Sequence, residues 1–325
     1  MKKKILSALL RVLLKVCAAV SSPEQAQAAL SAGADRLVCD MDAMTAPELL
    51  KLFDICAGQA VWRSAGRAEL FIALPAVFRQ ETMTAAGNEI LKLAGLHPDG
   101  WLVRTVGELE FLKQHDIPGI FAADAGIWAM NSRAAAVLKE AGFDEFTYSP
   151  ELSSKDITQM NEEMTGEAYA GSGIFPVYGR VPLMISANCV RGDASDGRQC
   201  QRSPSRFTEL TDRKGARLPV RTVCRRGYSI IFNSVPTYLL DMADQMPVPR
   251  AAAAAGPAVI PGPAVISCVF TDEDPEETGR IVREAVKLRD RTGSAGSAAE
   301  DVSVRSASDV VSAGFTRGHF RKGAE

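Results

Sequence analysis

Short apolar runs recur along the chain at intervals that suit β-strands separated by helices. Each run is three to seven residues long, rich in β-branched or other large apolar side chains, and bounded by glycine, proline or polar residues. This pattern predicts eight strands, at Leu13–Ala19, Arg36–Cys39, Leu70–Leu74, Trp101–Arg104, Ile120–Ala123, Phe146–Tyr148, Gly173–Val177 and Val265–Phe270.

Helical patterns fill the intervals between these runs, and some carry clear end signals. Ser22 is placed to cap the first helix and Gly33 to stop it. The segment Thr45-Ala46-Pro47-Glu48 has a capping-box pattern with proline near the first turn. We therefore expect helices at Pro23–Ala32, from Thr45 onward, and at Thr84–Ala94, Val106–Gln114, Ser132–Ala141, Ser154–Met164 and Pro275–Arg291.

The regular alternation of strand and helix predicts a parallel sheet. Eight such units favour the α/β fold of a closed, TIM-like (β/α)8 barrel, with an open doubly wound sheet as the second choice. Residues 1–325 then form one barrel domain. Residues 250–263 and 292–308 are rich in alanine, glycine, proline and serine, which predicts two flexible loops.

The amino terminus and the cysteine usage favour a cytoplasmic protein. Arg11 and Lys15 interrupt the first apolar run, which argues against a secretion signal. No run approaches the roughly 20 apolar residues that span a bilayer, so no membrane partner is expected. Seven cysteines in 325 residues do not suggest a secreted disulfide framework.

The predicted seventh strand is followed by a long insertion, residues 178–233, that concentrates positive charge. It holds eleven basic residues against four acidic ones, a net charge of +7 in a chain whose net charge is −2. Such a local excess predicts a surface that faces an anionic partner. The candidate contacts are Arg191, Arg213, Lys214, Arg217, Arg221, Arg225 and Arg226.

The same insertion holds three of the seven cysteines, Cys189, Cys200 and Cys224. A hairpin turn at Asp212–Gly215 would bring Cys224 back towards the other two. Thiolates are soft ligands, so three together could bind an iron–sulfur cluster or zinc. Their spacing, with ten and then 23 intervening residues, matches no standard metal motif, and ordinary packing in a loop is the open alternative.

Polar residues directly after predicted strands lie at the functional face of a barrel, because the active site of this fold lies at the carboxyl ends of the strands. Arg104, Asp124 and Glu151 occupy such positions, each with a helix cap or loop stabiliser as the alternative role. The tryptophans Trp62, Trp101 and Trp128 are expected to pack in the core or at the barrel ends.

The insertion and the carboxyl terminus together resemble peptidase family U-32, the collagenase-like peptidases. The matching segments are Tyr178-Gly179-Arg180-Val181-Pro182-Leu183-Met184-Ile185-Ser186, Cys189, Cys200, Leu210-Thr211-Asp212-Arg213, Pro219-Val220, Cys224, Tyr228, Asn233-Ser234-Val235-Pro236 and Thr316-Arg317-Gly318-His319-Phe320-Arg321-Lys322-Gly323-Ala324-Glu325. The likeness spans roughly Val12 to Glu325 and is greatest to the carboxyl-terminal half of the long members. Tyr178 and His319, which lie in these motifs, join Arg104, Asp124 and Glu151 as candidate catalytic residues.

The resemblance implies two kinds of chemistry. Some members are described as collagenases, and others are iron–sulfur proteins that hydroxylate transfer or ribosomal RNA using prephenate, or that assist ubiquinone hydroxylation. In the latter, four cysteines hold a four-iron four-sulfur cluster. Cys189, Cys200 and Cys224 match three of these ligands, and Gly227 stands where the fourth is expected. A partner protein that supplies the other half of the long members is also implied.

Three functions follow from these observations. An iron–sulfur enzyme or subunit that acts in RNA hydroxylation comes first, and a collagenase-like peptidase second. The chain has no His-Glu-x-x-His zinc pair and no Gly-x-Ser-x-Gly elbow, so no visible motif supports proteolysis. The third is a non-catalytic subunit that binds RNA or a protein partner.

Overall fold

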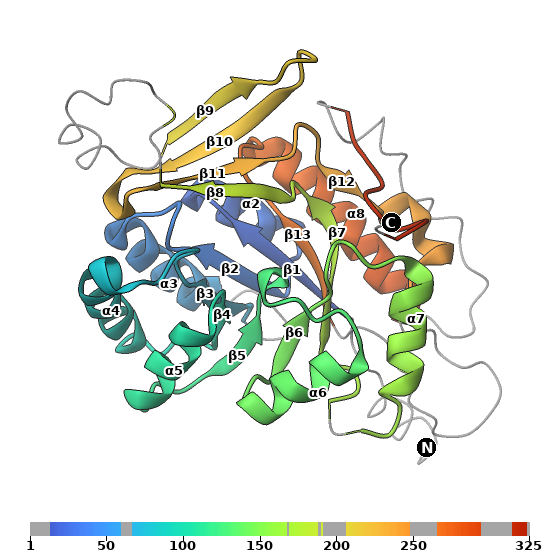
Figure 1. The fold of residues 1–325 in the computed structure, drawn as a ribbon, viewed down its shortest axis with the longest axis horizontal. Helices are drawn as coiled ribbons and strands as arrows, with labels where there is room; N and C mark the ends of the chain where they lie inside the picture. The colour runs from blue at the N-terminus through green and yellow to red at the C-terminus, as the bar shows by residue number, and fades with distance from the viewer. Residues whose placement is uncertain are drawn as a thin grey trace.

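The computed structural model describes residues 14–59, 67–167, 169–187, 190, 206–247, 265–293 and 314–323. Within these ranges, a ring of parallel strands is surrounded by helices, and a separate antiparallel sheet lies across one end of the ring (Figure 1). The candidate site lies where this second sheet meets the barrel.

Eight parallel strands pair in a closed circle. Neighbours follow chain order from β1 to β7, β7 also pairs with β13, and β13 pairs with β1. Lys15 lies opposite Val265, and Phe146 lies opposite Gly173, so no open edge separates the first strand from the last. The predicted (β/α)8 barrel is therefore confirmed. Its strands are β1 (Lys15–Val20), β2 (Arg36–Asp40), β3 (Glu69–Ala73), β4 (Gly100–Val103), β5 (Ile120–Ala123), β6 (Glu145–Thr147), β7 (Gly173–Gly179) and β13 (Val265–Val269).

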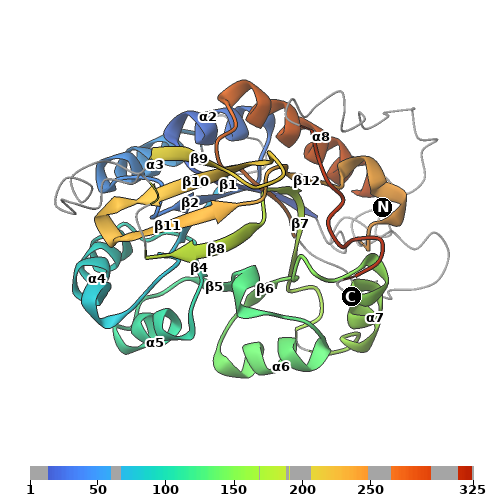
Figure 2. The ribbon, with the colours of Figure 1, turned by 45° about the horizontal axis from the view of Figure 1, so that its top comes forward.

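Helices follow these strands and cover the outside of the barrel (Figures 1 and 2). The Ser22 hydroxyl caps the first of them by accepting a hydrogen bond from the Gln25 N–H at 3.2 Å. The third begins four residues before the predicted Thr84, at a position where Arg79 makes no side-chain capping bond and so leaves no sequence signal. The helices are α2 (Pro23–Ala32), α3 (Ala46–Gln59), α4 (Gln80–Ala94), α5 (Val106–Gln114), α6 (Ser132–Ala141), α7 (Ser154–Glu163) and α8 (Pro275–Gly293).

The core has two layers because side chains alternate along each strand. One set packs beneath the helices, and a smaller set fills the barrel interior around Cys17, Val38 and Phe71. Arg36 closes the amino end of the barrel. Its guanidinium lies 4.0 Å from the centroid of the Phe71 ring and is paired with two carboxylates, Glu69 and Glu145. This pairing compensates the cost of burying the charge, so the amino end serves packing, and the open end is the opposite one.

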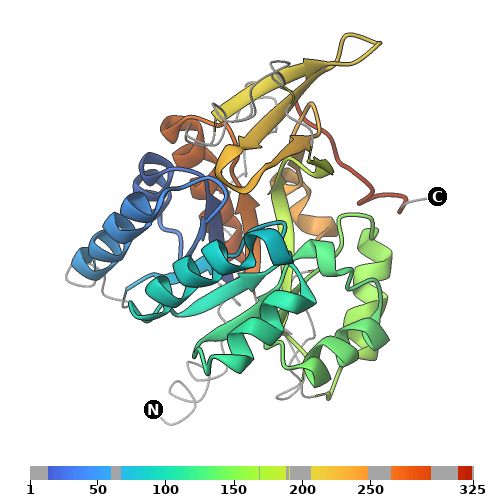
Figure 3. The same cartoon turned by 60° about the vertical axis from the view of Figure 1, so that its left-hand side comes forward.

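Four antiparallel strands form the second sheet, which we call the inserted sheet. Its order is β8 (Pro182–Ser186), β11 (Tyr228–Phe232), β10 (Arg217–Val223) and β9 (Arg206–Thr211). The predicted turn at Asp212–Gly215 joins β9 to β10, and Gly215 supplies the left-handed backbone that it needs, with φ at +83°. Figure 3 shows the β9–β10 hairpin extending away from the barrel.

The chain leaves the inserted sheet through β12 (Thr237–Tyr238), which pairs antiparallel with the end of β7. Residues 314–323 return to this place, where Thr316 forms a bridge with Thr237. The predicted loop at 250–263 lies outside the described residues. So does most of 292–308, although residues 292 and 293 belong to α8. Within the described ranges, no helix is both long enough and apolar enough to cross a bilayer.

Candidate active site

Charged side chains converge at the carboxyl end of the barrel. The inserted sheet lies over this end (Figure 2). We call these side chains the mouth cluster, and they come from both parts of the fold. The barrel contributes Asp40 at the end of β2, Asp42 after it, Glu89 on α4, Arg104 after β4 and Asp124 after β5, and the inserted sheet with its connection η4 (Cys224–Arg226) contributes Arg221, Arg225, Arg226 and Tyr228.

Arg104 occupies the centre of the mouth cluster. Its two terminal nitrogens each lie 3.1 Å from an Asp40 carboxylate oxygen, and Nη1 also donates to the Leu74 carbonyl at 2.9 Å. Nε contacts Asp124 at 3.2 Å, and Nη1 lies 3.4 Å from Asp42. Arg104, which follows β4, thus joins the ends of β2, β3 and β5. Arg104 and Asp124 were each expected at the functional face of the barrel, and in the structure they are in contact.

The two carboxylates after β2 have opposite electrostatic environments. Burial opposes ionisation of Asp40, but the charges of Arg104 and Arg221 outweigh it and hold the pKa of Asp40 well below its usual range. Asp42 is fully buried, and burial together with the Asp40 charge raises its pKa. The two neighbouring carboxylates therefore differ in acidity, because arginine charges dominate at Asp40 and burial dominates at Asp42.

Three arginines hold the inserted sheet on the barrel. Arg221 donates to Asp40 at 2.7 Å and to the Ser21 hydroxyl at 2.5 Å. Arg226 lies 3.2 Å from Asp42 and 2.7 Å from Glu89, and Arg225 donates to the backbone carbonyls of the residues that follow β2. Arg221 and Arg226 are almost fully buried, so their ion pairs are shielded from solvent. Loss of either partner would leave an uncompensated buried charge.

Tyr228 and a small apolar cluster complete the contact between the two parts. The Tyr228 hydroxyl donates to Asp42 at 2.5 Å, and burial beside that carboxylate raises the tyrosine pKa. Val223, Ile230 and Phe232 pack with Tyr228 against Ala76 and Val77 after β3. The inserted sheet is therefore attached to the barrel by a network of ion pairs and hydrogen bonds, with a small apolar contact beside it.

Glu108 supports the mouth cluster from below. One carboxylate oxygen accepts hydrogen bonds from the backbone N–H groups of Arg104 at 2.8 Å and Thr105 at 2.9 Å. Burial raises the pKa of Glu108 to about 8, so the side chain is largely protonated at neutral pH. The Thr105-x-x-Glu108 capping box was a visible sequence signal for this residue, but only its helix-capping role could be read from it.

A second polar group lies beside the mouth cluster, where β7 meets the loop after β13. The Tyr178 hydroxyl donates to the Glu273 carboxylate at 2.8 Å, and Arg180 pairs with Asp272 at 3.1 Å. Burial raises the pKa of both Tyr178 and Glu273. Ser21 connects the two groups. Its hydroxyl accepts a hydrogen bond from Arg221 of the mouth cluster and donates one to the carbonyl of Phe270, which begins the loop that carries Asp272 and Glu273.

The other two candidate catalytic residues lie in a different part of the described chain. Glu151 follows β6, and its N–H donates to the Ser149 hydroxyl at 3.3 Å. His319 is exposed in the carboxyl-terminal segment, where its ring nitrogen lies 3.0 Å from the Gly323 carbonyl. Among the described residues, no hydrogen bond joins either of them to the mouth cluster.

The predicted RNA contacts separate into two sets. Arg213, Lys214 and Arg217, which we call the cationic tip, are exposed at the outer end of the β9–β10 hairpin. Arg221, Arg225 and Arg226 face the barrel mouth and are bound to carboxylates or carbonyls. Arg191 lies outside the described residues. The charge excess of the insertion is therefore divided between an outer surface and an inner attachment.

Of the three candidate metal ligands, Cys224 lies in the described part of the chain. It begins a 3₁₀ turn, η4 (Cys224–Arg226), at the inner end of β10, and is buried. Cys189 and Cys200 lie outside the described residues, and the described side chains alone contain no group of three metal ligands. Gly227 follows η4 with φ at +74°, and a Cβ placed there would meet no atom within 4 Å. Space for a side chain is therefore present beside Cys224.

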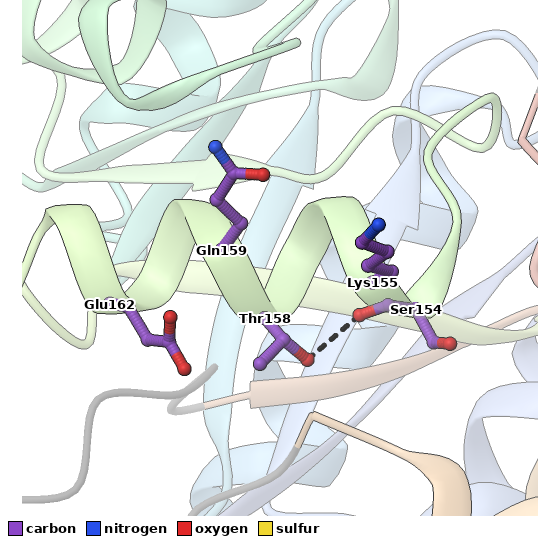
Figure 4. A pocket seen from close by; sticks show the side chains of 5 residues that line it. All are labelled: Ser154, Lys155, Thr158, Gln159 and Glu162. Carbon is purple, nitrogen blue, oxygen red and sulfur yellow. Dashed lines mark hydrogen bonds between the residues drawn. The ribbon is translucent and has the colours of Figure 1, made fainter.

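A shallow hollow on the outer surface runs along α7 (Figure 4). It is lined by Ser154, Lys155, Thr158, Gln159 and Glu162, and the Thr158 hydroxyl donates to the Ser154 carbonyl within the helix. None of these residues belongs to the mouth cluster, so this hollow plays no part in the candidate site.

Comparison with known proteins identifies the family. The model of peptidase family U32 matches residues 21–206, more than half of the chain, and no curated protein matches the sequence. Among solved structures, a U32 peptidase is 11% identical with a TM-score of 0.41, covering 52% of this chain and 70% of its own. Thiamine phosphate pyrophosphorylase from Pyrococcus furiosus is 9% identical with a TM-score of 0.43, covering 87% and 98%. A chitinase from Chromobacterium violaceum is 10% identical with a TM-score of 0.38, covering 84% and 99%. On the family match, the chain belongs to peptidase family U32.

Proposed function

We propose that this U32-family protein acts in RNA hydroxylation, as an iron–sulfur enzyme or as a subunit of one. The observation that carries the proposal is the difference between the two ends of strand β10. Its outer end begins at the exposed cationic tip, and its inner end leads into Cys224 at the barrel mouth. One strand therefore connects a surface suited to phosphates with a thiol suited to a metal centre.

The dimensions of β10 fit an RNA substrate. A strand rises about 3.3 Å per residue, so the seven residues of β10, Arg217–Val223, span on the order of 20 Å. An RNA stem held at the cationic tip could extend an unpaired loop towards the barrel mouth. Sequence-specific RNA proteins commonly act on such unpaired segments, because the bases of an A-form helix are poorly accessible.

The surroundings of Cys224 support a cluster. Cys224 is buried at the start of η4, so a group bound there would be shielded from solvent. The open space at Gly227 leaves room on the same turn. An iron–sulfur cluster bound there, with Cys189 and Cys200 as further ligands, would supply redox chemistry at the barrel mouth. The oxygen atom of the new hydroxyl group and the oxidising equivalents would have to come from a hydroxyl donor, for which the family resemblance implies prephenate.

The described residues offer less support for peptidase activity. A cysteine protease needs a thiol within hydrogen-bond reach of a base. The rings of His115 and His319 contact the carbonyls of Phe111 and Gly323, and neither histidine contacts Cys224. The mouth carboxylates are likewise engaged by arginines. The hydroxylase proposal therefore fits the described part of the chain better.

Binding of a stem-loop RNA tests the role of the cationic tip. The affinity of the wild-type protein should fall steeply with salt, and the paired substitution Arg213→Glu and Lys214→Glu should weaken it about ten-fold or more and lower the salt slope. The matched control is Lys155→Glu on α7, an exposed lysine on the outer surface, which should bind as the wild type does. Salt-independent affinity, or full binding after the tip reversal, would reject RNA as the partner.

A further inference from the structure

We propose that Trp128 is a stacking platform for an unpaired nucleobase at the barrel mouth. The inference rests on the proposed function, and it names a contact that the cationic tip does not provide. Trp128 follows β5 and the short 3₁₀ turn η1 (Ala125–Ile127), at the carboxyl end of the barrel. It was expected to pack in the core or at a barrel end; it lies at a barrel end, but about half of its side chain is exposed.

The exposure of Trp128 is unusual for its size. Its side chain is 52% exposed, whereas Trp101, in the neighbouring strand β4, is fully buried. Tryptophan offers a large, flat aromatic surface with a polar N–H at its edge, which suits it to a contact that is partly apolar and partly polar. The residues beside it behave differently, because Ile127 and Met130 pack against the main core and Ala129 is buried.

The backbone holds Trp128 in a strained conformation. Its φ and ψ angles are 62° and 56°, the left-handed region that non-glycine residues rarely adopt. Its N–H donates to the Ala125 carbonyl at 3.1 Å, and its carbonyl accepts from the Met130 N–H at 2.8 Å. Ala129 then forms a bridge with Tyr148 at the end of β6. The loop is therefore fixed on both sides, and the strain is maintained in order to present the indole outward.

The neighbouring groups suit a base. Asp124 begins the same 3₁₀ turn, about 8 Å along the chain from Trp128 at the usual rise of that helix. Its carboxylate accepts from the Ala125 N–H and from Arg104, which leaves further acceptor positions for a base amino group. Stacking on an aromatic ring tolerates any base, so the indole would hold an unpaired nucleotide while polar groups at the mouth contact its edge.

The test compares the wild type and four variants for binding to a 12-nucleotide single-stranded RNA at fixed salt. Trp128→Ala should weaken binding roughly ten-fold, the usual effect of removing one stacking partner. Trp128→Phe should retain most of the affinity, whereas Trp128→Leu, which keeps apolar bulk without a flat ring, should behave like Trp128→Ala. Val137→Ala, on the exposed face of α6, is the control and should bind as the wild type does.

The outcomes separate this inference from the proposed function. Equal affinity of Trp128→Leu and wild type would overturn stacking, because an aliphatic side chain would then serve RNA binding as well as the indole does. Full binding by Trp128→Ala, combined with loss of binding after Lys214→Glu, would overturn the platform and leave RNA as the partner. A wild-type protein that binds no RNA would reject both. Circular dichroism and melting temperatures of the variants establish that each one folds, and Trp128→Phe provides the comparison if Trp128→Ala does not.

Discussion

The guanidinium of Arg221 lies 2.7 Å from the carboxylate of Asp40, although the two residues are 181 positions apart. Arg221 belongs to the inserted sheet and Asp40 ends β2 of the barrel, so this ion pair joins the two parts of the fold. Both side chains are nearly buried, which makes the contact sensitive to the loss of either partner.

We predict that Arg221→Ala loosens the inserted sheet. Removing one member of a buried ion pair leaves Asp40 short of a partner and costs about 3 kcal/mol. The control is Arg217→Ala at the other end of the same strand, where the pair with Glu209 is exposed to solvent and contributes little. Hydrogen exchange of the β10 and β11 amides should accelerate in the first variant and not in the second. Equal protection in both would contradict the attachment of the sheet through Arg221.

Stability should depend on pH through Glu108. Burial raises its pKa from 4.5 to about 8, so the folded protein binds this proton more tightly than the unfolded chain. The resulting stabilisation is complete below pH 4.5 and is lost as the pH rises through 8. Relative to Glu108→Gln, which does not titrate, the wild type should lose roughly 3–4 kcal/mol of unfolding free energy between pH 5 and pH 8. The unfolding free energies of both proteins would be measured by denaturant titration across this pH range. If they changed in parallel with pH, Glu108 would have an ordinary pKa.

The packing of the barrel wall should not tolerate a methyl group at Gly173. A Cβ built there lies 2.3 Å from the ring of Tyr148, which is itself buried and fixed by a hydrogen bond to Asn161. Gly173→Ala should therefore destabilise the fold by about 2–3 kcal/mol. At Gly126 a Cβ meets no atom within 4 Å, so Gly126→Ala should be neutral or slightly stabilising. Thermal unfolding of the two variants distinguishes them, and a similar loss in both would refute the packing argument.

Gly227→Cys should add a ligand to a cluster at Cys224. The substitution has space but places a side chain at φ +74°, which costs about 1–2 kcal/mol. Gly215→Cys is the matched control, since Gly215 has φ +83° and equal space but lies at the hairpin turn. After anaerobic purification, iron retention should rise in Gly227→Cys alone. An equal gain in both variants would indicate adventitious binding to a new thiol.

The barrel could be predicted because its signal is local. Strand runs and helix ends such as Ser22 and Gly33 act over a few residues, and repeating them eight times leaves few possible arrangements. The start of α4 was missed where no capping side chain is present, at Arg79. The role of Arg36 in closing the amino end of the barrel was missed as well. Arg36 gains its partners Glu69 and Glu145 only when the barrel closes.

The candidate site was only partly predictable. Arg104 and Asp124 were identified because both follow strands directly. A count of charges could not reveal that Arg221 and Arg226 turn inward, since their carboxylate partners are distant in sequence and are brought close only by folding. Trp128 was taken for a packing residue because tryptophan usually is one, and its exposure depends on a left-handed backbone that the sequence does not signal.

Iron and acid-labile sulfide analysis of the anaerobically purified protein, with its absorption spectrum, tests the account most directly. The wild-type protein should be brown and contain both elements, and Cys224→Ser should lose them, while Cys56→Ser, at a buried cysteine of α3, should keep them. A wild-type protein without iron or sulfide, or one whose iron survives in Cys224→Ser, would contradict a redox centre at the inner end of β10.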